Sequence, residues 1–367
     1  MVASLFPSRL QLLAGLMTGE KAYAGPAWLT LDVTHRCNCV CLGCSCRSAM
    51  QRQHSFGNPT SGDLPFEIVE KLCRELPAWK CQLISLAGQG EPLLHPRIFE
   101  LIASFQKAGV DVLLSTNGIL LDDAVAERLC DSGLDRLHIT FWAADHEEHT
   151  EWHPGLNPAF LELRMEAISH VVEARRKRGR VKPRVFVHLP LTRSAVRNIE
   201  KRIQMALQTP CDGVSLDYFR AWGGPLEPFA LRPEDVEAER KNFETAAARL
   251  DAAGKVHNIY ELLTRTERLR SYGRIPCHAG WFQIYVLVDG TLAACTHCSL
   301  IIGDLKRQSF AEIWNGSPLR EFRRVGANPE RLKFAAGCDC VNCCAMKDNL
   351  RVERIFRWFR PFAKRVS

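Results

Sequence analysis

The chain has 367 residues, of which 46% are hydrophobic, and a formal net charge of +7. That length and composition are sufficient for a full-sized core. The small charge surplus, without blocks of like charge, does not indicate a nucleic-acid-binding protein. The apolar N-terminal stretch 5–17 is interrupted by Pro7, Ser8 and Arg9, lacks the features of a signal peptide and is too short to span a membrane, so we expect a cytoplasmic protein.

From residue 28 onward, short apolar runs alternate with longer amphipathic segments. The apolar runs predict strands at 28–34, 82–88, 111–116, 134–143, 184–192 and 213–219. The amphipathic segments predict helices at 64–76, 96–109, 122–133, 157–179 and 194–208. Six such alternations imply parallel strands joined by helical crossovers, in either an open wound sheet or a partial barrel.

Composition divides the chain further. A charged, alanine-rich segment predicts a helical linker. The cysteine-rich segment that follows it predicts one clear strand, at 281–290. We therefore expect an N-terminal arm (1–26), a core (27–224), a linker (225–270), a second domain (271–350) and a basic amphipathic tail (351–367).

The 16 cysteines are concentrated in two regions, with five between residues 37 and 46 and seven between residues 277 and 344. In a reducing compartment, clustered cysteines hold metal more often than they form disulfides. The four cysteines outside these regions are expected to be small buried hydrophobes: Cys73, Cys81, Cys130 and Cys211.

The first group contains Cys37-x3-Cys41-x2-Cys44 directly after the first predicted strand. Three thiolates on a short loop can bind three irons of a 4Fe–4S cubane and leave the fourth iron for another ligand. A structural zinc site, by contrast, has all four positions filled. Cys39 and Cys46 offer rival registers, so a zinc knuckle built on Cys41-x2-Cys44 is an alternative.

This stretch, including Asn38 and the preceding strand, resembles the signature of the radical S-adenosylmethionine (SAM) superfamily. The resemblance implies that the open iron binds the amino and carboxylate groups of SAM. It also implies that an electron from the cluster cleaves SAM to methionine and a 5′-deoxyadenosyl radical. The family usually has an aromatic residue just before the third cysteine, where this chain has Gly43.

Further turns at strand ends also resemble this family. Gly88-Gln-Gly90-Glu91-Pro92 is similar to its Gly-Gly-Glu-Pro motif, which binds the methionine amino group; glycine allows close backbone approach and Glu91 offers an acceptor to an ammonium. Ser115-Thr-Asn-Gly118 is similar to a turn near the SAM ribose. The resemblance and the strand ends together predict these SAM contacts: Gly90, Glu91, Pro92, Ser115, Asn117, Thr140 and Thr192.

One departure concerns the SAM carboxylate. His149-Thr-Glu-Trp-His153 lies where many members have a His-Asp-x-x-Arg pattern, whose arginine often meets that carboxylate. His153 therefore puts this contact in doubt. The fold that the resemblance implies is a partial, TIM-like (β/α)6 barrel with a small C-terminal iron–sulfur domain.

The late cysteines resemble the C-terminal SPASM or twitch extension of the same family, with Cys277, Gly290 and Cys295 followed by a crowded group at 338–344. The crowding favours the twitch form, with one auxiliary 4Fe–4S cluster. The predicted ligands are Cys277, Cys295, Cys340 and Cys343. Cys338 or Cys344 could replace one of the last two, Cys298 could enter the shell, and a zinc ribbon is the alternative.

The resemblance implies a radical SAM oxidoreductase or epimerase that receives electrons from a flavodoxin- or ferredoxin-type donor. We expect the substrate to be a small polar metabolite, such as a sugar or an aminocyclitol. In an epimerisation a thiol would return hydrogen, and the candidates are Cys298, Cys211 and Cys344. The residues expected to line the substrate pocket are Tyr218, Arg220 and Trp222.

Three alternatives remain open. The chain could be a ribosomal-peptide maturase or a non-catalytic metal-binding scaffold. It could also act on a lipid-linked substrate, with the basic tail 351–367 in peripheral contact with an anionic membrane. For that tail we favour the simpler interpretation of a helix packed on the protein with a solvated basic face.

Overall fold

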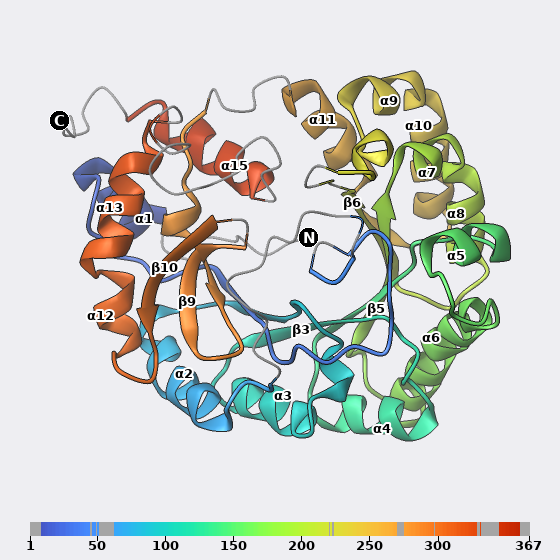
Figure 1. The fold of residues 1–367 in the computed structure, drawn as a ribbon, viewed down its shortest axis with the longest axis horizontal. Helices are drawn as coiled ribbons and strands as arrows, with labels where there is room; N and C mark the ends of the chain where they lie inside the picture. Colours follow the sequence, from blue (N-terminus) through green and yellow to red (C-terminus); the bar gives the residue numbers. More distant parts are fainter. Residues whose placement is uncertain are drawn as a thin grey trace.

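The computed structural model describes residues 9–44, 46–48, 50, 62–219, 221, 224–269, 275–296, 298–328, 331 and 345–359. Its strands form one sheet in the order β10-β9-β8-β1-β2-β3-β4-β5-β6-β7. Figure 1 shows this sheet curving around a central space, with helices along its outer side. The predicted α/β fold class is therefore confirmed, and the curved sheet is an open barrel whose edges are β10 and β7.

Seven parallel strands form the barrel part of the sheet: β1 (Trp28–Leu31), β2 (Leu83–Leu86), β3 (Asp111–Thr116), β4 (Arg136–Thr140), β5 (Arg184–Leu191), β6 (Gly213–Tyr218) and β7 (Val256–His257). The crossover helices are α2 (Phe66–Trp79), α3 (Ile98–Lys107), α4 (Asp123–Asp131), α5 (His146–Trp152), α6 (Phe160–Lys177), α7 (Arg193–Arg197) and α8 (Ile199–Leu207). All six predicted strands of the core are present.

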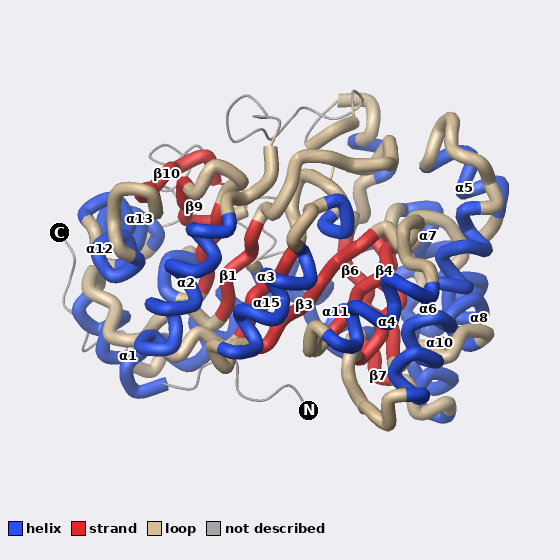
Figure 2. Tube along the Cα trace, turned by 90° about the horizontal axis from the view of Figure 1, so that it is seen from below, coloured by secondary structure: helices blue, strands red, loops and turns tan. Residues whose placement is uncertain are grey.

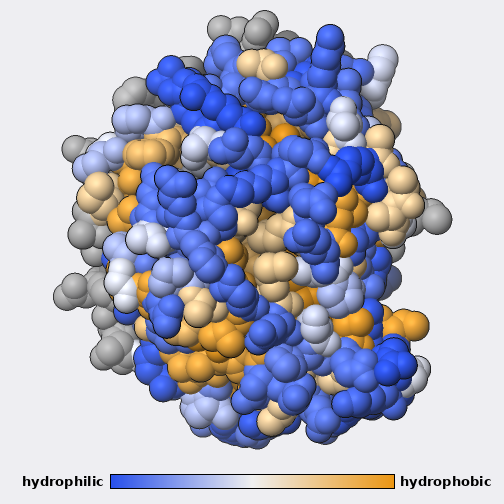
Figure 3. Space-filling view, turned by 90° about the vertical axis from the view of Figure 1, so that its right-hand side faces the viewer, coloured by the Kyte–Doolittle hydropathy of each residue, from blue (hydrophilic) through white to orange (hydrophobic). Residues whose placement is uncertain are grey.

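Alternation along the strands separates an apolar outer face from a more polar inner face. Leu29 and Leu31 of β1 are fully buried against the helices, whereas Thr30 between them faces the barrel interior and is half-buried. The helices complete the core with apolar stripes; in α2 these residues are Ile68, Val69, Leu72 and Leu76. Figure 3 shows a largely hydrophilic outer face, with apolar side chains visible only in places.

The structure differs from the predicted elements at three places. Helix α5 was not predicted, and the helix expected at 194–208 is divided at Asn198, whose φ of −110° and ψ of 30° are not helical. The segment predicted as a helical linker contains η2 (Glu227–Phe229), α9 (Pro233–Ala238), α10 (Arg240–Ala252) and α11 (Ile259–Leu269), and also strand β7. Two-residue strands such as β7 are too short for periodicity to reveal.

The C-terminal part extends the barrel's sheet. After η3 (Ala279–Trp281), β8 (Gln283–Val286) pairs in parallel with β1, and β9 (Thr291–Cys295) and β10 (Cys298–Asp304) follow in antiparallel order. Figure 2 shows β9 and β10 on the β1 side of the sheet, away from α8 and α10. The predicted strand at 281–290 is present only as the four residues of β8.

Within the described residues, four helices cover this C-terminal part: α1 (Arg9–Thr18), α12 (Phe310–Trp314), α13 (Ser317–Gly326) and α15 (Met346–Phe356). Lys71 of α2 donates hydrogen bonds to the carbonyls of Leu305 and Gln308, each at 2.6 Å, and so ties this part to the barrel. No helix within the described residues is long and apolar enough to cross a membrane.

Candidate active site

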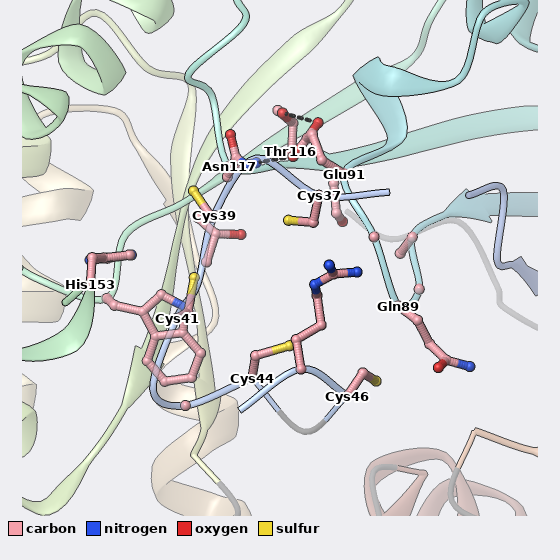
Figure 4. Close-up of a pocket in the computed structure, with 18 of the residues that line it drawn as sticks. Cys37, Cys39, Cys41, Cys44, Cys46, Gln89, Glu91, Thr116, Asn117 and His153 are labelled. Atoms are coloured by element: carbon pink, nitrogen blue, oxygen red, sulfur yellow. Dashed lines mark hydrogen bonds between the residues drawn. The ribbon is translucent and has the colours of Figure 1, made fainter. Parts of the chain in front are cut away.

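A cavity of about 290 Å³ lies at the carboxyl ends of β1 to β4, the end of the sheet where parallel barrels build their sites. Figure 4 shows its labelled side chains around one open space, with the thiols of Cys37, Cys41 and Cys44 on different sides of it and Cys37 next to Glu91. The cavity therefore unites the cysteine loop with the turns that end β2, β3 and β4.

The donor set and the space fit a 4Fe–4S cluster. Cys37, Cys41 and Cys44 line the cavity from one short loop, where the Cys44 N–H donates to the Cys41 carbonyl at 3.1 Å. A hydrogen bond from Cys46 lowers the pKa of Cys44 to about 6. Burial raises the pKa of Cys37, and a hydrogen bond donated to Cys39 together with burial raises that of Cys41. Three thiols for four irons leave one iron of the cluster free for another ligand.

Two glycines bring the turn after β2 against the cysteine loop. At Gly88, where φ is +147°, a β-carbon would overlap Asp32, whose carboxylate accepts the Gln89 N–H at 3.0 Å. At Gly90, a β-carbon would overlap the carbonyl oxygens of Thr34 and Arg36. Close backbone contact, as expected from the motif, is therefore what these glycines provide.

Glu91 is 2% exposed, and its carboxylate forms hydrogen bonds mainly with other residues of the protein. Its carboxylate accepts hydrogen bonds from the Thr116 hydroxyl at 2.6 Å, the Asn117 N–H at 2.7 Å and the Leu93 N–H at 3.1 Å. Burial raises the pKa of Glu91, and these hydrogen bonds oppose that rise. A carboxylate has about four acceptor positions, so Glu91 joins the β2 and β3 turns and retains limited capacity for an ammonium.

The turn after β3 is connected to the cysteine loop. The Asn117 side-chain amide donates to the Asn38 side-chain oxygen at 2.7 Å. Ser115 and Asn117 line the cavity, as does Thr140 at the end of β4. Motifs that are far apart in the chain are therefore adjacent here.

Five of the seven predicted SAM contacts line the cavity: Gly90, Glu91, Ser115, Asn117 and Thr140. The other two have local structural roles. Pro92 is the first residue of η1 (Pro92–Leu94), and the Thr192 hydroxyl accepts the Ala195 N–H at 3.1 Å as the N-cap of α7. Neither lines the cavity.

Several residues of the cavity wall were not among the predicted contacts: Cys39, Cys46, Arg47, Gln89, Trp142, His153 and Arg164. For Arg164, the sequence does contain a signal that could have identified it. It lies on the buried face of α6 with Leu161, Ile168 and Val171, where helical spacing predicts an apolar residue. A cation at such a position indicates either a buried ion pair or a ligand.

The predicted auxiliary-cluster ligands are only partly described. Cys295 and Cys298 are opposite each other across β9 and β10, both buried, and the Gln283 amide donates to the Cys295 sulfur at 3.3 Å. The Cys277 N–H donates to the Gly326 carbonyl at 2.8 Å. The remaining candidates lie outside the described residues: Cys338, Cys340, Cys343 and Cys344.

Two other predictions need correction. Cys211 precedes the amino end of β6, the opposite end of the strand from the cavity, and its thiol contacts the Ala206 carbonyl at 3.5 Å and the Lys255 amine at 3.4 Å. This position argues against Cys211 as a hydrogen donor. Tyr218 is directed toward α11, where its hydroxyl donates to the Leu262 carbonyl at 3.3 Å, and Arg220 and Trp222 lie outside the described residues.

Comparison with known proteins gives two family matches. Residues 31–203 match the radical SAM superfamily, and residues 277–344 match SPASM, an iron–sulfur cluster-binding domain. A relative from Methanosarcina barkeri, named AdoMet-dependent heme synthase, is 23% identical over 359 residues and covers 87% of this chain and 90% of its own.

Two solved structures share the fold. Native anSMEcpe with bound AdoMet aligns with a TM-score of 0.63 and 16% identity over 91% of this chain and 97% of its own. Streptococcus suis SuiB bound to the precursor peptide SuiA aligns with a TM-score of 0.63 and 13% identity over 86% of this chain and 70% of its own. The chain thus belongs to the radical SAM superfamily, with SAM and a 4Fe–4S cluster as cofactors and a C-terminal SPASM domain for auxiliary iron–sulfur clusters.

Proposed function

We propose that Cys37, Cys41 and Cys44 hold the catalytic cluster and that this chain abstracts hydrogen from a C–H bond of a small polar metabolite bound inside the barrel. The bound cluster supplies an electron that cleaves SAM and yields a 5′-deoxyadenosyl radical. The observation that carries the proposal is the single cavity shared by these cysteines and the predicted SAM contacts Gly90, Glu91, Ser115, Asn117 and Thr140.

The substrate class follows from the inner face of the barrel. Thr140 lines the cavity, and parallel pairing places His188 beside it and Ser215 beside His188, all on the same face of the sheet. His138, two residues before Thr140, stacks on His188 with ring centroids 5.8 Å apart. This wall offers hydroxyl and imidazole groups next to the site of radical formation.

Burial lowers the pKa of His138 to about 3 and lowers that of His188, so both rings are neutral at physiological pH. A neutral imidazole donates one hydrogen bond and accepts another, as hydroxyl groups do. The buried His188 Nδ1 has no hydrogen-bond partner among the described residues. Asp217, on the same face of β6 as Ser215, carries a carboxylate that can accept from an amine. These features favour a sugar or an aminocyclitol.

For the outcome we propose a net oxidation. The substrate loses a hydrogen atom to the radical, and the resulting substrate radical then loses a second electron and a proton. The auxiliary cluster implied by the SPASM match is the electron acceptor, and a flavodoxin- or ferredoxin-type protein in the cytoplasm reduces the catalytic cluster. An epimerisation would need a thiol on the opposite face of the substrate.

The heme synthase relative supports a second candidate, an enzyme that acts on heme or a related compound. Histidine is a common axial ligand of heme iron, and the neutral His188 faces the barrel interior. Titration of the protein with hemin, followed by its absorption spectrum, tests this candidate. Tight binding that His188→Ala abolishes would favour it over the metabolite.

Anaerobic reconstitution, iron counting and a SAM-cleavage assay with dithionite test the main proposal. We expect about eight irons per chain and formation of 5′-deoxyadenosine. Replacing Cys37, Cys41 and Cys44 by alanine should remove about four irons and all cleavage. The control Cys73→Ala, in α2, should change neither the iron content nor SAM cleavage. Zinc without SAM cleavage would refute the proposal and favour a metal-binding scaffold.

The substrate itself can be sought through the hydrogen that it loses. The enzyme is incubated with SAM and an ultrafiltered extract of cells grown in deuterated medium, from which peptides and proteins have been removed. Deuterium in 5′-deoxyadenosine, detected by mass spectrometry, would support a small-molecule substrate. Deuterium transfer only from the peptide fraction would instead support a peptide maturase, the activity suggested by the SuiA-bound SuiB neighbour.

A further inference from the structure

A group of buried basic side chains lies at the wall of the cavity, next to the cysteine loop. It consists of Arg164 from α6, His149 from α5 and His153, which follows α5. All three are at most 1% exposed, and both Arg164 and His153 line the cavity. Burying an arginine is costly unless its charge and its N–H groups find partners.

Arg164 has protein partners for only part of its guanidinium. Its Nε donates to the Asn117 carbonyl at 2.9 Å, and its Nη2 lies 3.8 Å from the Cys39 sulfur and 3.4 Å from His153 Nε2. Its Nη1 is buried and makes no hydrogen bond to any described residue. An anion in the cavity would supply the acceptor that this nitrogen lacks.

The two histidines also have ring nitrogens without hydrogen-bond partners in the described part of the chain. The ring of His149 stacks on that of His153 at 4.5 Å, and His149 Nδ1, His149 Nε2 and His153 Nδ1 are all buried without a hydrogen-bond partner among the described residues. Burial and the charge of Arg164 lower the pKa of both rings, that of His153 to about 3. The group thus has one fixed positive charge, on Arg164.

The acidic groups around this cluster are engaged elsewhere. Glu91 is close enough for the charge of Arg164 to oppose the rise that burial causes in its pKa. However, its carboxylate already accepts from Thr116, Asn117 and Leu93. Glu162 of α6 pairs with His146 at the surface. Among the described residues, no carboxylate forms an ion pair with Arg164, which leaves its Nη1 able to bind an anionic ligand of the cavity.

We propose that Arg164 binds the carboxylate of SAM, with Nη1 as a donor. The inference deepens the proposed function, because it requires SAM to bind in this cavity. His153 lies where the family pattern has an arginine, and the chain supplies the cation eleven residues later, from the next helix. His153, as the acceptor beside Nη2, helps to orient the guanidinium.

The test is the affinity of the reconstituted protein for SAM and for decarboxylated SAM, measured anaerobically by calorimetry. Arg164→Gln should weaken SAM binding about 10- to 100-fold, because a hydrogen bond to a charged group is lost. It should leave the affinity for decarboxylated SAM unchanged. The matched control Arg175→Gln, near the far end of the same helix, where it pairs with Asp212, should change neither affinity.

A variant that moves the arginine to position 153 provides a second, independent test. Adding His153→Arg to Arg164→Gln should recover at least part of the lost SAM affinity, because the charge returns to the same end of the cavity. If Arg164→Gln fails to incorporate iron, Arg164→Lys decides the matter. It keeps the charge, and its loss of affinity should again be confined to SAM.

The outcomes separate the two proposals. Failure of the unaltered protein to bind SAM refutes the proposed function itself. If the protein binds SAM and Arg164→Gln binds it equally well, Arg164 does not bind the carboxylate. Equal losses for SAM and decarboxylated SAM would show that Arg164 only supports the loop, and would likewise overturn the inference.

Discussion

Gly43 precedes the third cysteine of the loop, at the position where the family usually has an aromatic residue. A β-carbon on Gly43 would overlap the ring of Trp142, which follows β4 and lines the cavity. Trp142 stacks on Trp152 with ring centroids 5.4 Å apart and an interplanar angle of 11°. The aromatic side chain of this site therefore comes from a different segment, and glycine makes room for it.

This arrangement predicts the effect of restoring the aromatic residue. Gly43→Phe should displace Trp142, lower the thermal midpoint by several degrees, since overpacking costs about 1–3 kcal/mol, and remove about four irons per chain. Gly43→Phe combined with Trp142→Ala should regain the iron. Gly62→Ala is the control, because its β-carbon would meet no atom within 4 Å. Full iron content in Gly43→Phe alone would contradict the packing argument.

His138 gives a second prediction, on pH. Burial lowers the folded-state pKa of His138 to about 3, whereas the value in an unfolded chain is about 6.5. Below about pH 6.5 the unfolded chain takes up a proton that the folded chain does not, so stability is complete above that pH and is lost as the pH falls. In His138→Gln, the loss of unfolding free energy between about pH 7.5 and 5.5 should be about 1 kcal/mol smaller. Urea titrations of both proteins at the two pH values measure this difference. An equal loss of unfolding free energy in His138→Gln and the unaltered protein would show that His138 does not contribute to the pH dependence.

At the scale of elements, α15 connects the auxiliary cysteines to the rest of the fold. Asn349 of α15 accepts the buried His278 N–H at 2.7 Å, and Glu353 lies 3.0 Å from His278 Nε2. His278 directly follows Cys277, a predicted cluster ligand. Val352 and Phe356 are buried, which favours the interpretation that this part of the basic tail packs on the protein.

We therefore predict that Asn349→Ala loosens the auxiliary site selectively. The His278 N–H would lose its acceptor, at a cost of about 1–3 kcal/mol, and Cys277 would be held less firmly, by its bond to the Gly326 carbonyl. Iron should fall by about four per chain, while the other cluster and SAM cleavage are retained. Asn242→Ala, which removes an exposed bond to Glu239, should leave the iron content unchanged. Loss of SAM cleavage along with the iron would show instead that α15 supports the whole fold.

At the scale of the whole molecule, one continuous sheet joins the barrel strands to β8, β9 and β10 of the C-terminal region. β8 pairs with β1 through four residues, from Trp28 opposite Gln283 to Leu31 opposite Val286. The SPASM region therefore covers what would otherwise be the edge of the barrel sheet. An uncovered edge strand exposes unpaired N–H and carbonyl groups, to which other chains can add.

Ending the chain after residue 270 should consequently give aggregated protein rather than an isolated barrel. Size-exclusion chromatography of freshly purified protein measures this. A chain that ends after residue 359 keeps every described element and should elute like the full-length protein. A monomeric truncated barrel that still binds about four irons would show that the two regions fold independently.

Much of this architecture is visible in local sequence patterns. The six core strands and the Gly88–Pro92 turn are recognisable because alternation, helical spacing and glycine requirements depend on residues close together in the chain. The two cysteine groups are recognisable for the same reason, since short spacing places thiols on one loop. The division of the helix at Asn198 and the two-residue β7 depend on tertiary packing, which propensity does not reveal.

Contiguous motifs are enough to predict the family, the parallel α/β fold and the three cysteines proposed to hold the cluster. The side chains that complete the cavity are apparent only in the packed structure. Trp142 fills the space that Gly43 leaves, and Arg164 supplies the cation that is absent at position 153. Both compensate from segments distant in the chain, and burial and unsatisfied hydrogen bonds exist only once the helices have packed against the sheet.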